Sequence, residues 1–323
     1  MTEKLKKLTT SQGDNLLLLL ILAIAVTLVS MKQANFFSLG TLESICYQLP
    51  EMGLLTMAMM VPMLSGGINL SMIASANLSG IVMALIMTEN ISKGEDNVGI
   101  VIGAVAVGIL ISTLVGLING VIIAYFKIPA MLVTLGMQML LNGACLVITK
   151  GATISGYPAS FKFLGNGKLG FIPMPFVLFA AALILLVVFL KNTPFGPKIY
   201  LYGSNNVATG FSGVDDKVLL MKTYPISGLL VGLAAVILTS RFNSAAAGYA
   251  ESFLMQSILI AVLGGISPDG GKGKVSGMVL SVIIIQVVAS GLNILRISSY
   301  LTTAVYGLIL LAAIAFRSKK SGN

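Results

Sequence analysis

Long apolar runs separated by short polar connections fill almost the whole chain. The runs cover residues 15–31, 46–64, 68–88, 98–125, 129–149, 174–190, 218–240, 252–266, 275–292 and 297–316. A helix needs roughly 20 apolar residues to cross a bilayer. The runs are continuous rather than alternating, which favours helices over a barrel. The pattern predicts an all-α polytopic membrane protein of about ten transmembrane helices, forming one transmembrane domain over residues 1–323.

The distribution of basic residues predicts how these helices are oriented. Only 10% of the 323 residues are charged, and 13 of the 20 Lys and Arg lie in the tails and the even-numbered connections. By the positive-inside rule, both termini are then cytoplasmic. An eight-span interpretation, with two short runs re-entrant, gives the same orientation. The net charge of +9 thus reflects membrane topology rather than nucleic-acid binding. No A-x-A-like site follows the first run, so no cleavable signal peptide is predicted.

The segment Thr193–Asp216 is one of the longest polar interruptions, and the orientation places it in the cytoplasm. Two prolines and a glycine in its first half, TPFGPK, break a helix. Its second half, NNVATGF, predicts a helix of about two turns, with Asn205 or Asn206 capping its start and Gly213 ending it. A short amphipathic helix between two spans is typical of a docking feature. An ordinary solvated loop is the alternative.

Two glycine-rich connections also face the cytoplasm in this topology. The first is GGINLS, Gly66–Ser71, where adjacent glycines let the chain leave helical geometry. Such backbone is tolerated at this depth only where protein or a water-filled cavity covers it. It indicates either a broken helix beside a transport path or a tight, closely packed hairpin. The second, Gly264–Gly277, is not a phosphate loop, because neither Lys272 nor Lys274 has a glycine six residues before it.

Amide side chains are the main polar groups inside the predicted spans. They either bond neighbouring helices together or line the path of a hydroxylated substrate. Only Glu51, near one end of a run, brings a carboxylate close to a span, whereas proton-driven carriers generally need one near the centre. The amides in question are Asn77, Asn119, Gln138, Asn142, Gln256 and Gln286.

The residues that enzymes use for catalysis are scarce in this chain. It has no His, no paired carboxylates and no nucleophile arrangement, so it is not expected to be an enzyme or to bind a metal. Cys46 and Cys145 lie in apolar runs and are expected to be buried thiols.

Three motifs, in order, resemble the membrane permeases of ribose-type ABC importers, in the superfamily shared with nucleoside and branched-chain amino-acid permeases. GGINLSMIASANLSG resembles the family's GGIDLSVGSxxALSG, and YLYGSNNVATGFSGVD resembles its cytoplasmic segment YAxGxNxxAAxxSGI. The stretch from VLGGISPDGG to YGLILLAAI resembles its long C-terminal pattern. Together the motifs span residues 66–316.

This resemblance implies a multi-pass protein of the bacterial inner membrane that works with a second permease copy, a cytoplasmic ATPase and an extracytoplasmic substrate-binding protein. ATP would be used by the partners, and this chain would bind no cofactor. By the resemblance, the residues that dock into the ATPase are Asn205, Asn206, Val207, Ala208, Gly210, Phe211, Ser212 and Gly213. The expected residues of the substrate path are Gly66, Gly67, Asn69, Ser71, Asn77 and Asn142.

Three residues depart from the family pattern. Asn69 replaces the usual Asp, Asn206 replaces an acidic residue, and Thr209 replaces the second Ala of a pair. They indicate a divergent subgroup or a heterodimer whose other subunit keeps the acidic residues.

The expected cargo is a small hydroxylated solute, a monosaccharide first and a nucleoside or branched-chain amino acid as alternatives. An ATP-independent secondary carrier is the rival from another class.

Overall fold

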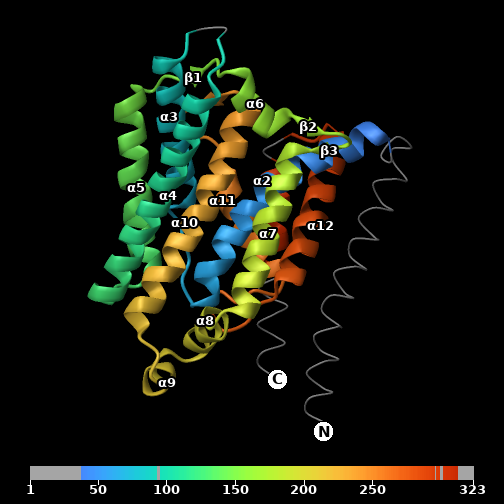
Figure 1. Ribbon diagram of the computed structural model, residues 1–323. Coiled ribbons are helices and arrows are strands. Elements are labelled where there is room, and N and C mark those ends of the chain that lie inside the picture. The colour runs from blue at the N-terminus through green and yellow to red at the C-terminus, as the bar shows by residue number, and fades with distance from the viewer. Residues whose placement is uncertain (1–37, 93–94, 295, 299–300, 312–323) are drawn as a thin grey trace.

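The computed structural model describes residues 38–92, 95–294, 296–298 and 301–311 (Figure 1). Within them, six helices are long and apolar enough to cross a membrane: α3, α4, α5, α7, α10 and α12. The expected span 15–31 and the end of the span 297–316 lie outside the described residues. The remaining expected runs each contain a helix, although α11 and the helix Leu301–Leu311 are shorter than a bilayer requires.

The described elements are, in chain order, α2 (Leu39–Leu64), α3 (Met72–Asn90), α4 (Val98–Phe126), α5 (Ala130–Thr149), β1 (Ile154–Ser155), α6 (Ala159–Asn166), β2 (Lys168–Leu169), β3 (Ile172–Pro173), α7 (Met174–Asn192), α8 (Phe195–Ser204), α9 (Asn206–Phe211), α10 (Asp216–Phe242), β4 (Ser244–Ala245), α11 (Ser252–Leu263) and α12 (Val275–Ile294). Strands β1 and β4 pair antiparallel, as do β2 and β3.

Helices α2 and α10 form the centre of the bundle. The apolar side chains of α2 from Leu54 to Leu64 are almost fully buried, and α2 contacts α7, α10, α11 and α12. In the most apolar stretch of α10, 67% of residues are buried, against 17% in α5 and 28% in α4 and α7. The exposed apolar faces of α4, α5 and α7 are suited to contact with lipid.

Helices α4 and α10 approach each other closely because small residues line their contact. A β-carbon at Gly116 of α4 would overlap the carbonyl oxygen of Tyr224 in α10. In turn, a β-carbon at Gly228 of α10 would overlap the carbonyl oxygen of Ser112 in α4. In a membrane, an apolar side chain gains little by moving from lipid to a helix contact, because lipid tails are also apolar. Close packing through small residues therefore helps to hold the helices together.

The prolines and glycine after α7 end that helix as expected, but they also begin the next one. Helix α8 starts at Phe195 and holds Gly196 and Pro197 in its first turn. Proline is tolerated there because the first backbone N–H groups of a helix have no partner within it. A β-carbon at Gly196 would overlap the carbonyl oxygen of Leu190, so the turn between α7 and α8 is tight.

The two ends of the bundle are built differently. Helices α8 and α9 lie at one end, and β1, α6, β2 and β3 lie at the other (Figure 1). We call these the coupling end and the outer end.

Candidate functional site

Helix α9 projects from the coupling end and carries the residues expected to dock a partner (Figure 1). Asn205 caps it by accepting a hydrogen bond from the Ala208 N–H at 2.9 Å, and Gly213 follows with φ +76°. The expected cap and ending are therefore confirmed. Val207 is 67% exposed and Phe211 90% exposed, and the other six expected docking residues are also exposed. We call these eight residues the coupling face.

The buried side of α9 explains one departure from the family pattern. Thr209 is only 4% exposed, and its hydroxyl donates to the Asn205 carbonyl at 2.7 Å. The methyl and hydroxyl groups that distinguish it from Ala therefore lie beneath the coupling face. Asn206, in contrast, is exposed on that face, so its missing negative charge changes the surface that a partner would meet.

A cavity of about 930 Å³ opens beside α9 at the coupling end. Gly66 and Gly67 from the expected path and Asn205, Asn206 and Val207 from the coupling face all line it. The buried Tyr224 also lines it, and its hydroxyl has no hydrogen-bond partner within the described part of the chain. Connections following α2, α4 and α11 contribute as well, through Ser65, Lys127 and Asp269. The connections predicted to share one side of the membrane therefore converge.

The GGINLS segment is neither helical nor a tight hairpin. Helix α2 ends at Leu64, Gly66 beyond it has φ +79°, and the Gly67 N–H donates back to the Pro62 carbonyl at 3.0 Å. The chain then runs without helical structure until α3 begins at Met72. Protein covers this stretch: Thr134 of α5 donates its hydroxyl to the Ile68 carbonyl at 2.9 Å.

A chain of buried hydrogen bonds holds the same segment to α2 and α10. Because Pro62 has no N–H, the Ala58 carbonyl lacks its helical donor, and the Ser227 hydroxyl of α10 supplies one at 2.7 Å. The Asn69 amide in turn donates to the Ser227 oxygen at 3.0 Å. Ser227 lies about 16 Å along α10 from Asp216, so this non-helical backbone reaches deep into the bundle.

The chain of bonds continues to α4. The Ser71 hydroxyl donates to the Asn69 side-chain oxygen at 2.8 Å, and Asn119 of α4 donates its amide to Ser71 at 2.9 Å. Asn69, Ser71 and Asn119 are all buried. These contacts place Asn69 and Ser71 in the packing between helices, whereas Gly66 and Gly67 border the cavity.

The other two expected path residues lie apart from this group. Asn77 of α3 borders a small cavity of about 20 Å³ and donates its amide to the Tyr249 carbonyl at 3.1 Å. Asn142 is half-buried on α5, and its side chain makes no hydrogen bond within the described residues. The six residues expected on the path therefore fall in separate places.

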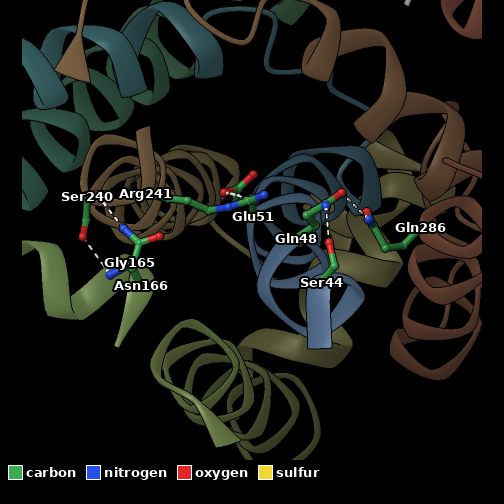
Figure 2. A network of polar contacts seen from close by, with 8 residues as sticks. All are labelled: Ser44, Gln48, Glu51, Gly165, Asn166, Ser240, Arg241 and Gln286. Atoms are coloured by element: carbon green, nitrogen blue, oxygen red, sulfur yellow. Dashed lines mark hydrogen bonds and ion pairs between the residues drawn. The ribbon is translucent and has the colours of Figure 1, made fainter. Parts of the chain in front are cut away.

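Towards the outer end, a polar network ties α2 to its neighbours (Figure 2). The Arg241 guanidinium of α10 donates to the Glu51 carboxylate of α2 at 2.5 Å, and Glu51 is 3% exposed. One turn earlier, Gln48 accepts a hydrogen bond from Gln286 of α12 at 2.8 Å. Gln48 also donates to Ser44 at 3.0 Å.

The neighbouring residue of α10, Ser240, connects the network to α6. Its hydroxyl accepts from the Gly165 N–H at 2.7 Å and donates to the Phe161 carbonyl at 2.6 Å. Its own carbonyl accepts from the Asn166 amide at 3.2 Å (Figure 2). The sequence singled out Glu51 and Gln286 but not Arg241 or Ser240, because the partners lie far apart in the chain.

Comparison with known proteins finds relatives over nearly the whole chain. Residues 41–314 match the family described as the permease component of branched-chain amino acid transport systems. The ribose import permease protein of Bacillus subtilis is 33% identical over 302 residues, covering 93% of this chain and 91% of its own. That of Haemophilus influenzae is 32% identical, covering 91% and 90%. The autoinducer 2 import system permease protein LsrD of Photorhabdus laumondii is 28% identical, covering 94% and 89%. No solved structure shows a significant match.

Proposed function

The chain belongs to the family of permease components of branched-chain amino acid transport systems, and we propose that it forms the membrane path of an ATP-driven importer for ribose or a similar monosaccharide. It is a multi-pass protein of the bacterial inner membrane and not an enzyme. The observation that carries the ATP-driven mechanism is α9, which projects from the bundle with Val207 and Phe211 exposed to solvent. Exposed apolar side chains on a projecting helix favour a protein partner.

The relatives supply the choice of solute. Ribose import permeases match over nine-tenths of both chains, and an autoinducer 2 permease matches at lower identity. A nucleoside or a branched-chain amino acid is the next alternative, since the superfamily transports these as well. A polar uncharged solute agrees with a bundle whose buried polar groups are mainly amides and hydroxyls.

We further propose about ten spans with both termini in the cytoplasm. Support comes from the cavity at the coupling end, which is lined by Ser65, Lys127, Asn205 and Asp269. These residues belong to four successive even-numbered connections of the ten-span topology, which must share one side of the membrane. That side is also the one with the excess of basic residues, so the coupling face points to the cytoplasm.

In this proposal, the coupling face docks a cytoplasmic ATPase, a second permease copy completes the path, and a substrate-binding protein delivers the solute at the outer end. Gly66 and Gly67 border the inner cavity and form its mouth, and Asn77 contributes near the outer end. Asn69 and Ser71 hold the non-helical segment that leads between them. Asn142 lies on α5, which is largely exposed along the side of the bundle, and it joins the path only if another chain covers that helix.

Replacement of Phe211 by Asp tests the docking role. Phe211 is 90% exposed, so the variant is expected to fold and insert normally while losing the co-purified ATPase and the uptake of labelled ribose. Phe171→Asp is the matched control for ATPase recovery alone, since Phe171 is fully exposed between β2 and β3, at the end of the bundle away from α9, and should leave the ATPase bound. Full uptake and normal ATPase recovery in Phe211→Asp would refute the docking assignment.

Depletion of ATP separates this mechanism from that of a secondary carrier. In cells whose ion gradients are held constant, ribose uptake through an ATP-driven permease stops when ATP is removed, whereas uptake through a carrier continues. Continued uptake would exclude the ATP-driven mechanism. If ribose is not taken up in the presence of ATP but a nucleoside is, the mechanism stands and the solute assignment fails.

A further inference from the structure

Three segments distant in sequence meet behind the coupling face. They are the end of α2 at Leu64–Gly67, the end of α8 at Gly203 and Ser204, and the glycine-rich connection between α11 and α12. Figure 1 shows α8 beside the lower end of α2. We call this meeting point the glycine junction.

The junction is packed backbone against backbone. A β-carbon at Gly203 would overlap the carbonyl oxygen of Leu64 and the backbone nitrogen of Gly271. These two atoms are themselves hydrogen-bonded to each other, because the Gly271 N–H donates to the Leu64 carbonyl at 3.0 Å. Gly203 therefore lies against the bond that joins the end of α2 to the α11–α12 connection, with no side chain between them.

Gly270 makes the same close contact from the other side. A β-carbon there would lie 2.7 Å from both the Gly203 carbonyl oxygen and the Gly66 nitrogen. Its φ of +92° also belongs to the left-handed region that favours glycine. A glycine is therefore needed at position 270 both for the turn and for the close contact of the three segments.

A side-chain hydrogen bond fixes the position of α8 in the junction. The Tyr200 hydroxyl donates to the Gly273 carbonyl at 3.0 Å. Burial raises the pKa of Tyr200, so the hydroxyl keeps the proton that it donates. Helix α8 is consequently held to the α11–α12 connection at two places, at Tyr200 and one turn later at Gly203 and Ser204.

Helix α8 is joined to α9 by Asn205, which caps α9 and follows directly after Ser204. A displacement of α9 therefore reaches the junction through a single residue. Close-packed backbone transmits displacement because it has no flexible side chains to absorb it. Beyond the junction lie α2 on one side and the α11–α12 pair on the other.

We propose that the glycine junction transmits movement of the coupling face to α2 and to the α11–α12 pair, with Gly203 as its positioning residue. The proposal rests on the proposed ATP-driven function and adds the route by which ATP use would act on the bundle. Gly203 lies behind the coupling face rather than on it, so its replacement should separate transport from docking.

The test is Gly203→Ala in the complex of permease, ATPase and binding protein, reconstituted in lipid and measured for ATP hydrolysis and ribose uptake. ATPase recovery and basal hydrolysis are expected to match wild type, while the ribose taken up per ATP falls by about tenfold or more. Gly136→Ala, on α5 with open space around it, is the matched control and should keep the wild-type ratio. An unchanged ratio in Gly203→Ala, or loss of the bound ATPase, overturns the proposal.

Two further measurements keep the outcome clear if Gly203→Ala folds poorly. Tyr200→Phe removes only the hydroxyl, and a lower uptake per ATP with normal ATPase recovery is expected. Hydrogen exchange on the purified permease should show the Gly271 amide exchanging about tenfold faster in Tyr200→Phe, because its bond to Leu64 is loosened. If neither the exchange of the Gly271 amide nor the uptake per ATP changes in Tyr200→Phe, the role of the junction is refuted while the proposed function stands. A wild-type complex that transports without ATP would instead refute the proposed function, and the transmission role with it.

Discussion

The ion pair between Glu51 and Arg241 gives the sharpest test of the structure, because its two halves are unequally buried. The Glu51 side chain is 4% exposed and that of Arg241 is 23% exposed. Arg241→Met leaves a buried carboxylate without its partner, which should cost about 3–5 kcal/mol of unfolding free energy. Glu51→Gln leaves a cation that still reaches solvent and an amide oxygen that can accept its hydrogen bond. The expected loss is only about 1–2 kcal/mol.

The double variant provides the decisive comparison. Glu51→Gln combined with Arg241→Met removes both charges, and its loss should be about 1–2 kcal/mol, smaller than that of Arg241→Met alone. Glu51→Gln, although destabilising by itself, should therefore restore part of the unfolding free energy that Arg241→Met removes. The assay is unfolding of the purified permease in mixed micelles titrated with sodium dodecyl sulfate and followed by circular dichroism. Lys168→Met is the control, because its ion pair with Glu43 is half-exposed and should have no measurable effect. Additive losses in the double variant would refute the reasoning.

Three other substitutions test the packing around the site. Asn69→Asp should lose about 2–3 kcal/mol of unfolding free energy in the same assay, because a carboxylate cannot donate to Ser227 and would be buried; stability equal to wild type would contradict the bonded chain. Gly116→Leu should lower the yield of folded permease or its stability by about 3 kcal/mol, since α4 and α10 could no longer approach; a normal chromatographic profile and stability would contradict this contact. Thr209→Ala should leave ATPase recovery unchanged, because Thr209 lies beneath the coupling face; a clear loss of ATPase would place it on that face.

The sequence predicted the helices well because each element is specified by its own local pattern. Each expected run from 46–64 onward contains a described helix, and the cap at Asn205 and the ending at Gly213 are as expected. These features depend on continuous apolar runs and on residues within one turn of a helix end. Val207 and Phe211 are exposed, and their docking role stays a prediction.

The partners of the polar side chains could not be predicted in this way. Asn69 bonds to Ser227, which lies 158 residues away, and Glu51 bonds to Arg241, which lies 190 residues away. The local pattern does not distinguish a serine that donates to a carbonyl left free by a proline from a serine that faces lipid. Only the packing of α2 against α10 brings the Ser227 hydroxyl to the Ala58 carbonyl, so the role of Ser227 became visible with the fold.

The same two helices connect the ends of the molecule. Helix α2 connects Gln48 and Glu51 in the outer network to Leu64 in the glycine junction, and α10 extends from Asp216, near the coupling face, past Arg241 in the outer network. At 27 residues, α10 is about 40 Å long, enough to cross the bilayer as one element. Helix α2 carries Pro50 and Pro62 inside it and α10 carries Pro225, and the bond from Ser227 to Ala58 joins the two helices near Pro62 and Pro225. Because α2 and α10 are bonded at the middle and at the outer end, movement of one at the coupling end must either carry the other with it or break these bonds. The substitutions at Asn69 and at the Glu51–Arg241 pair therefore probe how α10 is joined to α2, which is one of the helices that the junction would move.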